Sequence, residues 1–252
     1  MGRFVKHTRC PKCAEEGKDR KGNNLGVYED GSCYCFSCGH VRGGRADRMY
    51  SKENTPKQSR TVNLPVFLPD DVCTEYPPVC VSWTRQYELS VEDLYANKCL
   101  WSDIYSRLIF TYYSSPENSL LGWQGRYFGE EDRPKWFSRG DLSSIYHIFN
   151  KGESKRFLVL VEDVVSSIKI GKTGIPVMPI FGSHISSKMI QRLSYITDKI
   201  IIWLDPDKRK ESIKFTNVSN VIGLHASAIF SDHDPKEESY EYIKEKVYEH
   251  TA

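Results

Sequence analysis

The sequence lacks the long apolar runs that membrane-spanning proteins contain. In its 252 residues, no run approaches the ~20 apolar residues that a membrane-spanning helix needs. The first ten residues are basic and have no apolar centre, which argues against a secretory signal peptide. These absences argue against membrane-spanning helices and predict a soluble protein of the cytoplasm.

A complete phosphate-binding P-loop is missing as well. The triplet Gly171-Lys172-Thr173 resembles the end of that motif, but Ser166 stands where the motif needs its first glycine. The triplet also closes a predicted helix, so no helix N-terminus faces a phosphate there. We therefore expect no ATPase or helicase module in this chain.

The chain has no large excess of either charge, but its charges are unevenly distributed. The net charge is +2. The first 60 residues contain 13 Lys and Arg against 7 Asp and Glu, whereas the remainder contains 22 against 26. A basic first part and an acidic remainder suggest that the first binds nucleic acid and that the second binds metal.

Five of the eight cysteines lie within the first 38 residues. Because disulfides are rare in cytosolic proteins, such a cluster is more often a metal site than a set of disulfides. Four of these five form two CxxC pairs: Cys10 with Cys13, and Cys35 with Cys38. Two such pairs at this spacing predict a tetrahedral zinc site of four thiolates. Cys33 and His40 are spare donors, and we interpret Cys33 as a non-ligand because it stands too close to Cys35 to share its turn.

A zinc ribbon is the structure that this pattern predicts for residues 1–49. A strand over residues 24–30, with a turn at Asp30-Gly31, would lie between the two cysteine pairs. So small a unit cannot bury a core, and the metal would therefore supply its folding energy. Basic residues flank the cysteine pairs and as a group suggest contact with nucleic acid, although an ordinary solvated face is the better explanation for any single one of them: Arg3, Lys6, Arg9, Lys12, Arg42, Arg45 and Arg48. Residues 50–64 are polar and lack periodicity, which is typical of a flexible linker.

Residues 65–156 are rich in aromatic side chains. Residues 107–110 and 122–124 are candidate strands. Basic side chains stand among the aromatic ones in the second half of this region: Arg126, Arg133, Lys135 and Arg139. This composition suits a single-stranded nucleic acid or a triphosphate. An ordinary antiparallel sheet with surface charges explains the local pattern equally well.

In the last third of the chain, two apolar runs end in acids. Residues 157–161 precede Glu162 and Asp163, and residues 200–204 precede Asp205, Pro206 and Asp207. Each run is too short for a helix and suits a strand buried on both faces of a parallel sheet. Pro206 cannot donate to a sheet ladder, so it marks the place where pairing ends.

Predicted helices separate these runs from further strands. Helical stretches cover residues 164–172 and 185–196, a polar helical stretch follows Asp207, and residues 175–180 and 218–224 are further candidate strands. Strands that alternate with helices predict parallel βαβ units. The acids would then gather at the carboxyl edge of one sheet, where open α/β sheets place their ligands. Carboxylates that lie close together suit Mg²⁺ or Mn²⁺.

Taken together, the sequence resembles bacteriophage DNA primases, which are related to bacterial replicative primases. Residues 10–13 and 34–39 resemble the two zinc knuckles of the family. Residues 107–110 and 124–126 resemble strands of its basic amino-terminal subdomain. Four stretches resemble the successive motifs of its Toprim catalytic domain: Val161-Glu162, Phe181-Gly182, Asp205-Pro206-Asp207 and Asp234-Pro235.

The resemblance implies an α/β protein of four parts. These are a zinc-ribbon template-binding domain (1–49), a flexible linker (50–64), a mixed α+β basic subdomain (65–156) and a Toprim-like parallel-sheet catalytic domain (157–252). The cofactors would be one structural Zn²⁺ and catalytic Mg²⁺ or Mn²⁺. Glu162 would be a metal ligand or a general base. The other implied metal ligands are Asp205, Asp207 and Asp234. The implied basic residues that handle the nucleotide are Arg126 and Lys135.

The sequence departs from the family pattern at two positions. Asp163 occupies the place of a glycine that usually follows the first catalytic Glu. Ser166 occupies the place of a further Asp. We therefore expect the second metal to be held differently, with help from Asp163.

The implied function is synthesis of short RNA primers on single-stranded DNA during phage DNA replication. The substrates would be ribonucleoside triphosphates, and the location would be the host cytoplasm if a phage encodes the chain. Phage relatives that fuse primase to helicase continue past this point, so we expect a separate helicase partner. One alternative is a Toprim-type nuclease or topoisomerase, although a topoisomerase would need a nucleophilic tyrosine and a longer chain. The other is a non-catalytic zinc-ribbon regulator that binds nucleic acid, which the intact Glu162, Asp205 and Asp207 disfavour.

Overall fold

The computed structural model describes most of the chain in two compact units, Met1–Val62 and Asn63–Ala252. The described residues are 4–19, 21–29, 31–35, 37–38, 40–42, 65–114, 118–152, 154–182 and 185–251. The predicted linker at 50–64 lies outside them, as do Arg3, Arg45 and Arg48. Within these ranges, no helix has the length and apolar character that crossing a bilayer requires.

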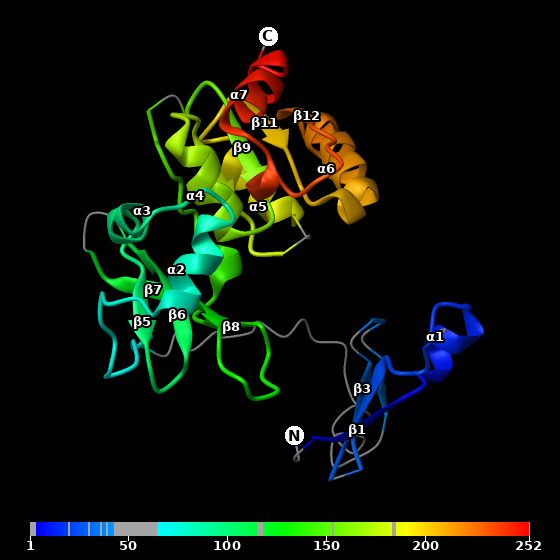
Figure 1. Ribbon diagram of the computed structural model, residues 1–252. Coiled ribbons are helices and arrows are strands. Elements are labelled where there is room, and N and C mark those ends of the chain that lie inside the picture. The colour runs from blue at the N-terminus through cyan, green and yellow to red at the C-terminus, as the bar shows by residue number, and fades with distance from the viewer. Residues whose placement is uncertain are drawn as a thin grey trace. The chain divides into compact units, whose positions relative to one another are not determined.

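The first unit contains an antiparallel sheet in the order β1-β2-β3-β4 (Figure 1). Its strands are β1 (Phe4–Thr8), β2 (Leu25–Tyr28), β3 (Cys33–Cys35) and β4 (Val41–Arg42). β2 confirms the strand predicted between the cysteine pairs. A short helix, α1 (Pro11–Glu15), starts with a proline, whose missing N–H costs nothing at the first helical position. Among the described residues of this unit, Leu25 is the one buried apolar side chain besides the cysteines.

The second unit contains an antiparallel sheet in the order β5-β6-β7-β8. Its strands are β5 (Leu100–Ser102), β6 (Arg107–Tyr113), β7 (Leu120–Tyr127) and β8 (Trp136–Arg139). Both strands predicted in this region are present, within β6 and β7. The helices α2 (Pro78–Arg85) and α3 (Val91–Ala96) share a core with this sheet through the buried Cys80 and Leu94.

A parallel sheet in the order β10-β9-β11-β12 forms the other part of the second unit. Its strands are β9 (Leu158–Val161), β10 (Val177–Pro179), β11 (Lys199–Ile202) and β12 (His225–Ala228). Its helices are α4 (Val164–Lys172), α5 (Ser187–Leu193), α6 (Arg209–Ile222) and α7 (Tyr240–Glu249). The predicted parallel sheet with alternating helices is therefore confirmed, and α4 has the predicted bounds.

The helices cover both faces of the parallel sheet (Figure 1). Val159 and Val161 of β9 pack in a core with α4 and α7. Leu158 and Leu160 point to the other face and pack with α5 and α6. All four residues are fully buried, as expected for a strand covered on both faces. The core on the α4 side also includes residues of the antiparallel sheet, so the two sheets of this unit share one hydrophobic cluster.

The strand predicted at residues 218–224 is wrong. These residues continue α6 as far as Ile222, and Gly223 ends the helix with φ +94°. The strand β12 follows at the edge of the sheet, and its small and polar residues carry no apolar signal. Val221 and Ile222 are 87% and 46% exposed, so this apolar run does not mark a buried strand.

Candidate functional site

Four cysteine thiols lie together in the first unit. Cys10 precedes α1 and Cys13 lies within it, whereas Cys35 ends β3 and Cys38 lies in the turn that follows. All four Sγ atoms lie within 4.8 Å of one another, with 3.7 Å between Cys10 and Cys38 and 3.6 Å between Cys13 and Cys35. A tetrahedral zinc ion with Zn–S bonds of about 2.3 Å places its sulfurs about 3.8 Å apart. The predicted four cysteines thus form a group that could hold a zinc ion.

A buried aspartate supports the first cysteine pair. Asp19 is 2% exposed and accepts hydrogen bonds from the backbone N–H groups of Cys10 (2.7 Å) and Asn23 (3.1 Å). These donors lower the pKa of the Asp19 carboxyl. Sequence reasoning missed Asp19, because a single aspartate in a polar stretch belongs to no motif. Cys33 lies outside the four-thiol group, and its Sγ is 4.0 Å from the Gly31 carbonyl oxygen.

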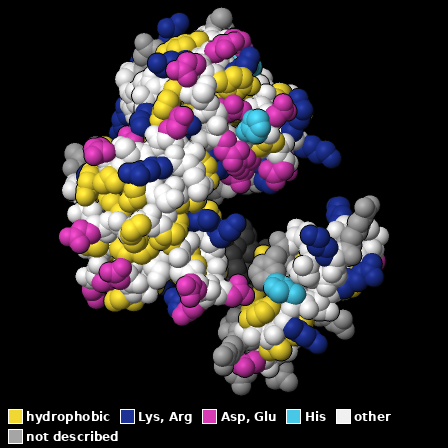
Figure 2. Space-filling model, viewed as in Figure 1, with side chains coloured by type: hydrophobic (Ala, Val, Ile, Leu, Met, Phe, Trp, Pro, Cys, Tyr) yellow, Lys and Arg dark blue, Asp and Glu magenta, His cyan; other side chains and the backbone are white. Residues whose placement is uncertain are grey.

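Acids gather at the carboxyl edge of the parallel sheet. Glu162 follows β9 and Asp205 follows β11, and both line a pocket of about 410 Å³ together with Asp163. On the face shown in Figure 2, acidic side chains cluster over the parallel-sheet part of the second unit. The turn after β10 fixes the position of Glu162, because the N–H of Gly182 donates to the Glu162 carbonyl oxygen at 3.2 Å. Gly182 adopts φ +140°, which glycine tolerates best.

Two carboxylate oxygens in this pocket are suited to a cation. Glu162 Oε2 and Asp205 Oδ1 are buried and find no hydrogen-bond partner among the described residues. A buried acceptor without a partner is destabilising unless water or an ion satisfies it. Carboxylate oxygens are the donors that Mg²⁺ and Mn²⁺ prefer. Glu162 and Asp205 therefore fit the divalent ion that the sequence predicts.

The same two carboxyl groups have perturbed acidities. Burial raises the pKa of Asp205 to about 7, because the Lys236 ammonium only partly offsets burial and the carboxylates of Asp234, Asp163 and Glu162. Burial also raises the pKa of Glu162 above its ordinary value. The cluster is therefore short of positive charge, which an added divalent cation would supply.

This electrostatic strain leads to a prediction about stability. We expect Asp205→Asn to be more stable than the wild type above pH 7 when no divalent ion is added. The folded-state pKa of Asp205 is about 7 and its ordinary value is 3.8, so the folded protein holds more protons between these limits. The free energy of unfolding therefore falls as the pH rises through this window. The variant avoids this loss, which we expect to be at least about 1 kcal/mol, or about 2–4 °C in the unfolding midpoint.

Thermal unfolding of both proteins at pH 4 and pH 8 measures the effect. The midpoint of Asp205→Asn relative to the wild type should be higher at pH 8 than at pH 4. Added Mg²⁺ should remove the advantage of the variant at pH 8. An equal difference at both pH values would show that the Asp205 carboxyl is not strained.

The other predicted acidic ligands have partners of their own. Asp207 is exposed and pairs with Lys208, although it is close enough to Glu162 to raise the pKa of that group. Asp163 caps α4 by accepting from the N–H groups of Val165 (2.8 Å) and Ser166 (3.0 Å).

Lys236 forms hydrogen bonds with two acids, Asp163 and Asp234. Its Nζ donates to Asp163 Oδ2 at 3.0 Å and to Asp234 Oδ2 at 2.6 Å. Burial opposes its charge, but the Asp163 carboxylate and the bond to Asp234 raise the pKa of Lys236 above its ordinary value. Sequence reasoning missed this residue, because a lysine beside an aspartate in a polar segment looks like an ordinary surface charge.

Basic and aromatic side chains of the antiparallel sheet line the same pocket. Arg126 lies on β7, and Lys135 directly precedes β8. The Arg126 guanidinium lies 5.2 Å from the ring centroid of Trp83 and 5.8 Å from that of Trp136. Its Nε is buried and has no hydrogen-bond partner in the described ranges. The pocket thus combines acids, cationic groups and half-buried aromatic side chains from segments that lie far apart in the sequence.

Arg107 holds the strands that carry these basic residues. It is 4% exposed and donates to the carbonyl oxygens of Gly125 (2.8 Å), Lys135 (3.2 Å) and Pro134 (2.8 Å). It therefore ties β6 to β7 and to the start of β8. Arg133 and Arg139 do not line the pocket.

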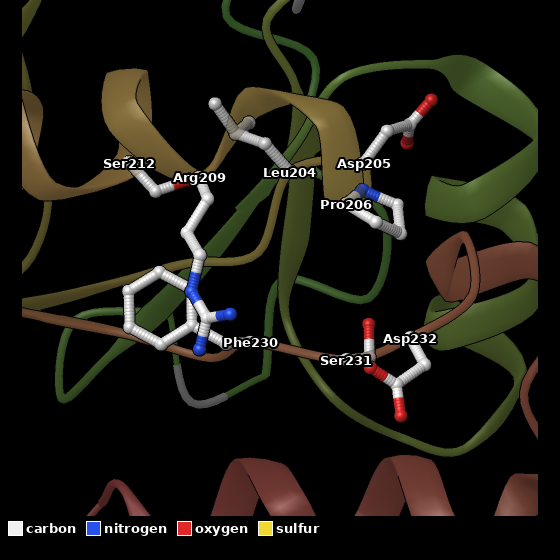
Figure 3. A pocket seen from close by; sticks show the side chains of 8 residues that line it. All are labelled: Leu204, Asp205, Pro206, Arg209, Ser212, Phe230, Ser231 and Asp232. Carbon is white, nitrogen blue, oxygen red and sulfur yellow. The ribbon is translucent and has the colours of Figure 1, made fainter.

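A second pocket, of about 220 Å³, is also lined by Asp205 (Figure 3). Its lining includes Pro206, Phe230 and Asp232 as well as Arg209. The Arg209 guanidinium lies 4.7 Å from the centroid of the Phe230 ring. Figure 3 shows the Asp205 carboxylate pointing away from Arg209. The two pockets therefore share Asp205, and each contains at least one arginine.

Comparison with known proteins finds similarity in structure. No protein-family model and no curated protein matches the sequence. The zinc-binding and RNA polymerase domains of Aquifex aeolicus primase match with TM-score 0.56 and 14% identity, over 98% of this chain and 79% of that one. The primase fragment of the bacteriophage T7 primase-helicase protein matches with TM-score 0.51 and 15% identity, over 98% of both chains.

A DnaG primase catalytic domain bound to single-stranded DNA matches with TM-score 0.54 and 15% identity, over 69% of this chain and 73% of that one. At these identities the similarity concerns the fold. The chain therefore has a fold like that of the zinc-binding and catalytic domains of DnaG-type primases, the phage T7 primase among them.

Proposed function

We propose that this chain is a DNA primase, a template-directed RNA polymerase that makes short primers on single-stranded DNA. The observation that carries the proposal is the pocket in which Glu162 and Asp205 meet Arg126 and Lys135, within a primase-like fold. One similar structure, a DnaG catalytic domain, has single-stranded DNA bound, which supports such a template here. A phage origin and a helicase partner also belong to the proposal, and they rest on the sequence resemblance.

The basic and aromatic wall of the pocket would bind the nucleotide. Arg126 and Lys135 would pair with the negative charges of the triphosphate, for which a planar guanidinium is well suited. Trp83 and Trp136 line the same pocket, and aromatic side chains stack on bases with little sequence preference. The unpartnered Nε of Arg126 leaves a donor available for a phosphate or base oxygen.

The acidic wall would hold the metal. Glu162, Asp205 and Asp207 are the proposed ligands of Mg²⁺ or Mn²⁺. When bound, the ion would bind triphosphate oxygens and lower the pKa of the attacking 3′-hydroxyl. In the reaction, the 3′-oxygen bonds to the α-phosphorus, the bond to pyrophosphate breaks, and the hydroxyl proton is released. Burial raises the pKa of Glu162, so this residue could accept that proton if it does not bind the metal.

The first unit would bind the template. The four-cysteine group could hold zinc, and the exposed residues Lys6, Arg9 and Lys12 add positive charge close to its first cysteine pair in the sequence. Such charge binds phosphate backbones and does so less strongly as the salt concentration rises. The parts of the chain would be the four predicted ones, with the linker at 50–64.

One reaction separates the proposed function from nuclease activity. The protein is incubated with Mg²⁺, four ribonucleoside triphosphates and a library of single-stranded DNA of random sequence. A primase yields short products that ribonuclease degrades and leaves the DNA at full length. Shortened DNA without RNA would instead favour a Toprim-type nuclease.

A further inference from the structure

One lysine lies inside the carboxylate cluster rather than at its rim. Lys236 belongs to a 3-10 helix, Pro235–Glu237, and its side chain is 14% exposed. Its ammonium bonds to Asp163 and Asp234, at 3.0 and 2.6 Å. These carboxylates come from segments far apart in the sequence, so the ammonium joins them as a bound cation would.

Asp163 has little remaining capacity for a metal ion. Its Oδ1 accepts from the backbone N–H groups of Val165 and Ser166. Its Oδ2 accepts from the Ser166 hydroxyl at 3.1 Å and from Lys236. A carboxylate offers about four acceptor positions, and those of Asp163 are taken. Ser166 stands where the family pattern has a further Asp, and its N–H and hydroxyl groups both donate to Asp163. These hydrogen bonds occupy oxygens that would otherwise be available to a metal ion.

Apart from the exposed Asp207, the acids of the cluster divide into two groups. Glu162 and Asp205 each have a buried oxygen that lacks a partner among the described residues. Asp163 and Asp234 already share a cation. One part of the cluster is therefore open to an ion, and the other part already contains the Lys236 ammonium.

We propose that Lys236 is a fixed internal cation that takes the place of one metal ion, so that this active site binds a single divalent ion through the proposed ligands Glu162, Asp205 and Asp207. Many polymerases and nucleases use two metal ions about 3.5–4 Å apart. An ammonium in one of the two positions would repel a second divalent ion from the same carboxylates. The purpose of the bound ion rests on the proposed function, but the number of ions can be counted without nucleotide or DNA. Lys236 is a positioning residue in this arrangement, since it acts through Asp163 and Asp234.

The test is the number of Mn²⁺ ions bound by the zinc-loaded full-length protein. Electron paramagnetic resonance detects free Mn²⁺, and zinc gives no signal in this measurement. Sites that persist in the double variant Asp205→Asn, Asp234→Asn, which loses a carboxylate from each of the two positions, belong elsewhere on the protein and are subtracted. We expect one ion in the wild type and two in Lys236→Asp, which replaces the ammonium by a further carboxylate. Lys246→Met is the matched control, because Lys246 pairs with Glu249 on α7, and it should bind one ion.

Each outcome decides the proposal. Two Mn²⁺ ions in the wild type would overturn it, and this result needs no variant to fold. A well-folded Lys236→Asp that still binds one ion would overturn it as well. RNA synthesis by a protein that binds two ions would leave the proposed function intact and refute the role of Lys236. One bound ion without RNA synthesis would support the role of Lys236 and refute the proposed function.

Discussion

Asp205→Asn is expected to lower RNA synthesis by at least about a hundredfold. Asp205 lines the same pocket as Arg126 and Lys135, and its Oδ1 is buried without a partner among the described residues. Loss of a residue that merely supports a metal ligand already costs about 10–100-fold in affinity or activity. Loss of a ligand oxygen should cost more. The measurement is the rate of ribonucleotide incorporation on single-stranded DNA at saturating Mg²⁺.

The chain offers a matched control on the same strand. Asp198 is exposed and directly precedes β11, at the end of the strand opposite to Asp205. Asp198→Asn should therefore retain wild-type activity. Zinc content should be unchanged in both variants, because the cysteine group lies in the other unit. Retention of a tenth or more of the activity by Asp205→Asn would remove Asp205 from the proposed metal site.

Cys35→Ser is expected to empty the zinc site and to abolish the start of new primers. The first unit buries Leu25 and cysteines but no other apolar side chain in its described part. Its folding must therefore depend on the metal, and zinc binding contributes about 10–16 kcal/mol in small zinc-finger peptides. The zinc content, measured by metal analysis, should fall from about one ion per chain to nearly none. Limited proteolysis should then degrade the first unit and leave the second intact.

Cys33→Ser is the control for this variant. Cys33 lies two positions from Cys35 on the same strand but outside the four-thiol group. The Cys33→Ser variant should retain both the bound zinc and the ability to start primers. Extension of a supplied oligoribonucleotide should survive in Cys35→Ser, because the proposed catalytic residues lie in the second unit. A loss of zinc in Cys33→Ser would contradict the proposed ligand set.

The sequence predicts much of the fold because its strongest signals are local. The apolar run before Glu162 forms β9, and α4 begins and ends at the predicted residues, Val164 and Lys172. The two CxxC pairs specify four thiols that the structure brings within 4.8 Å. β12 escaped prediction because it is a short edge strand of small and polar residues, which no apolar pattern marks.

The contacts that define the pocket could not be predicted in the same way, because they join distant segments. Lys236 meets Asp163 across 73 positions of sequence. Trp83 on α2 meets Arg126 on β7 through packing of helix against sheet. A local pattern reports whether a residue is apolar or charged, but not which distant residue it meets.

Retention of a 5′-triphosphate in the product tests most directly whether this chain starts RNA chains. The reaction on single-stranded DNA is run once with γ-labelled and once with α-labelled ribonucleoside triphosphates. A primase joins two nucleotides without a primer, so the first nucleotide keeps its γ-phosphate, and we expect γ-label in short products that depend on the DNA and on Mg²⁺. Products with α-label alone would indicate extension of existing ends, and the absence of both labels would contradict the proposed function.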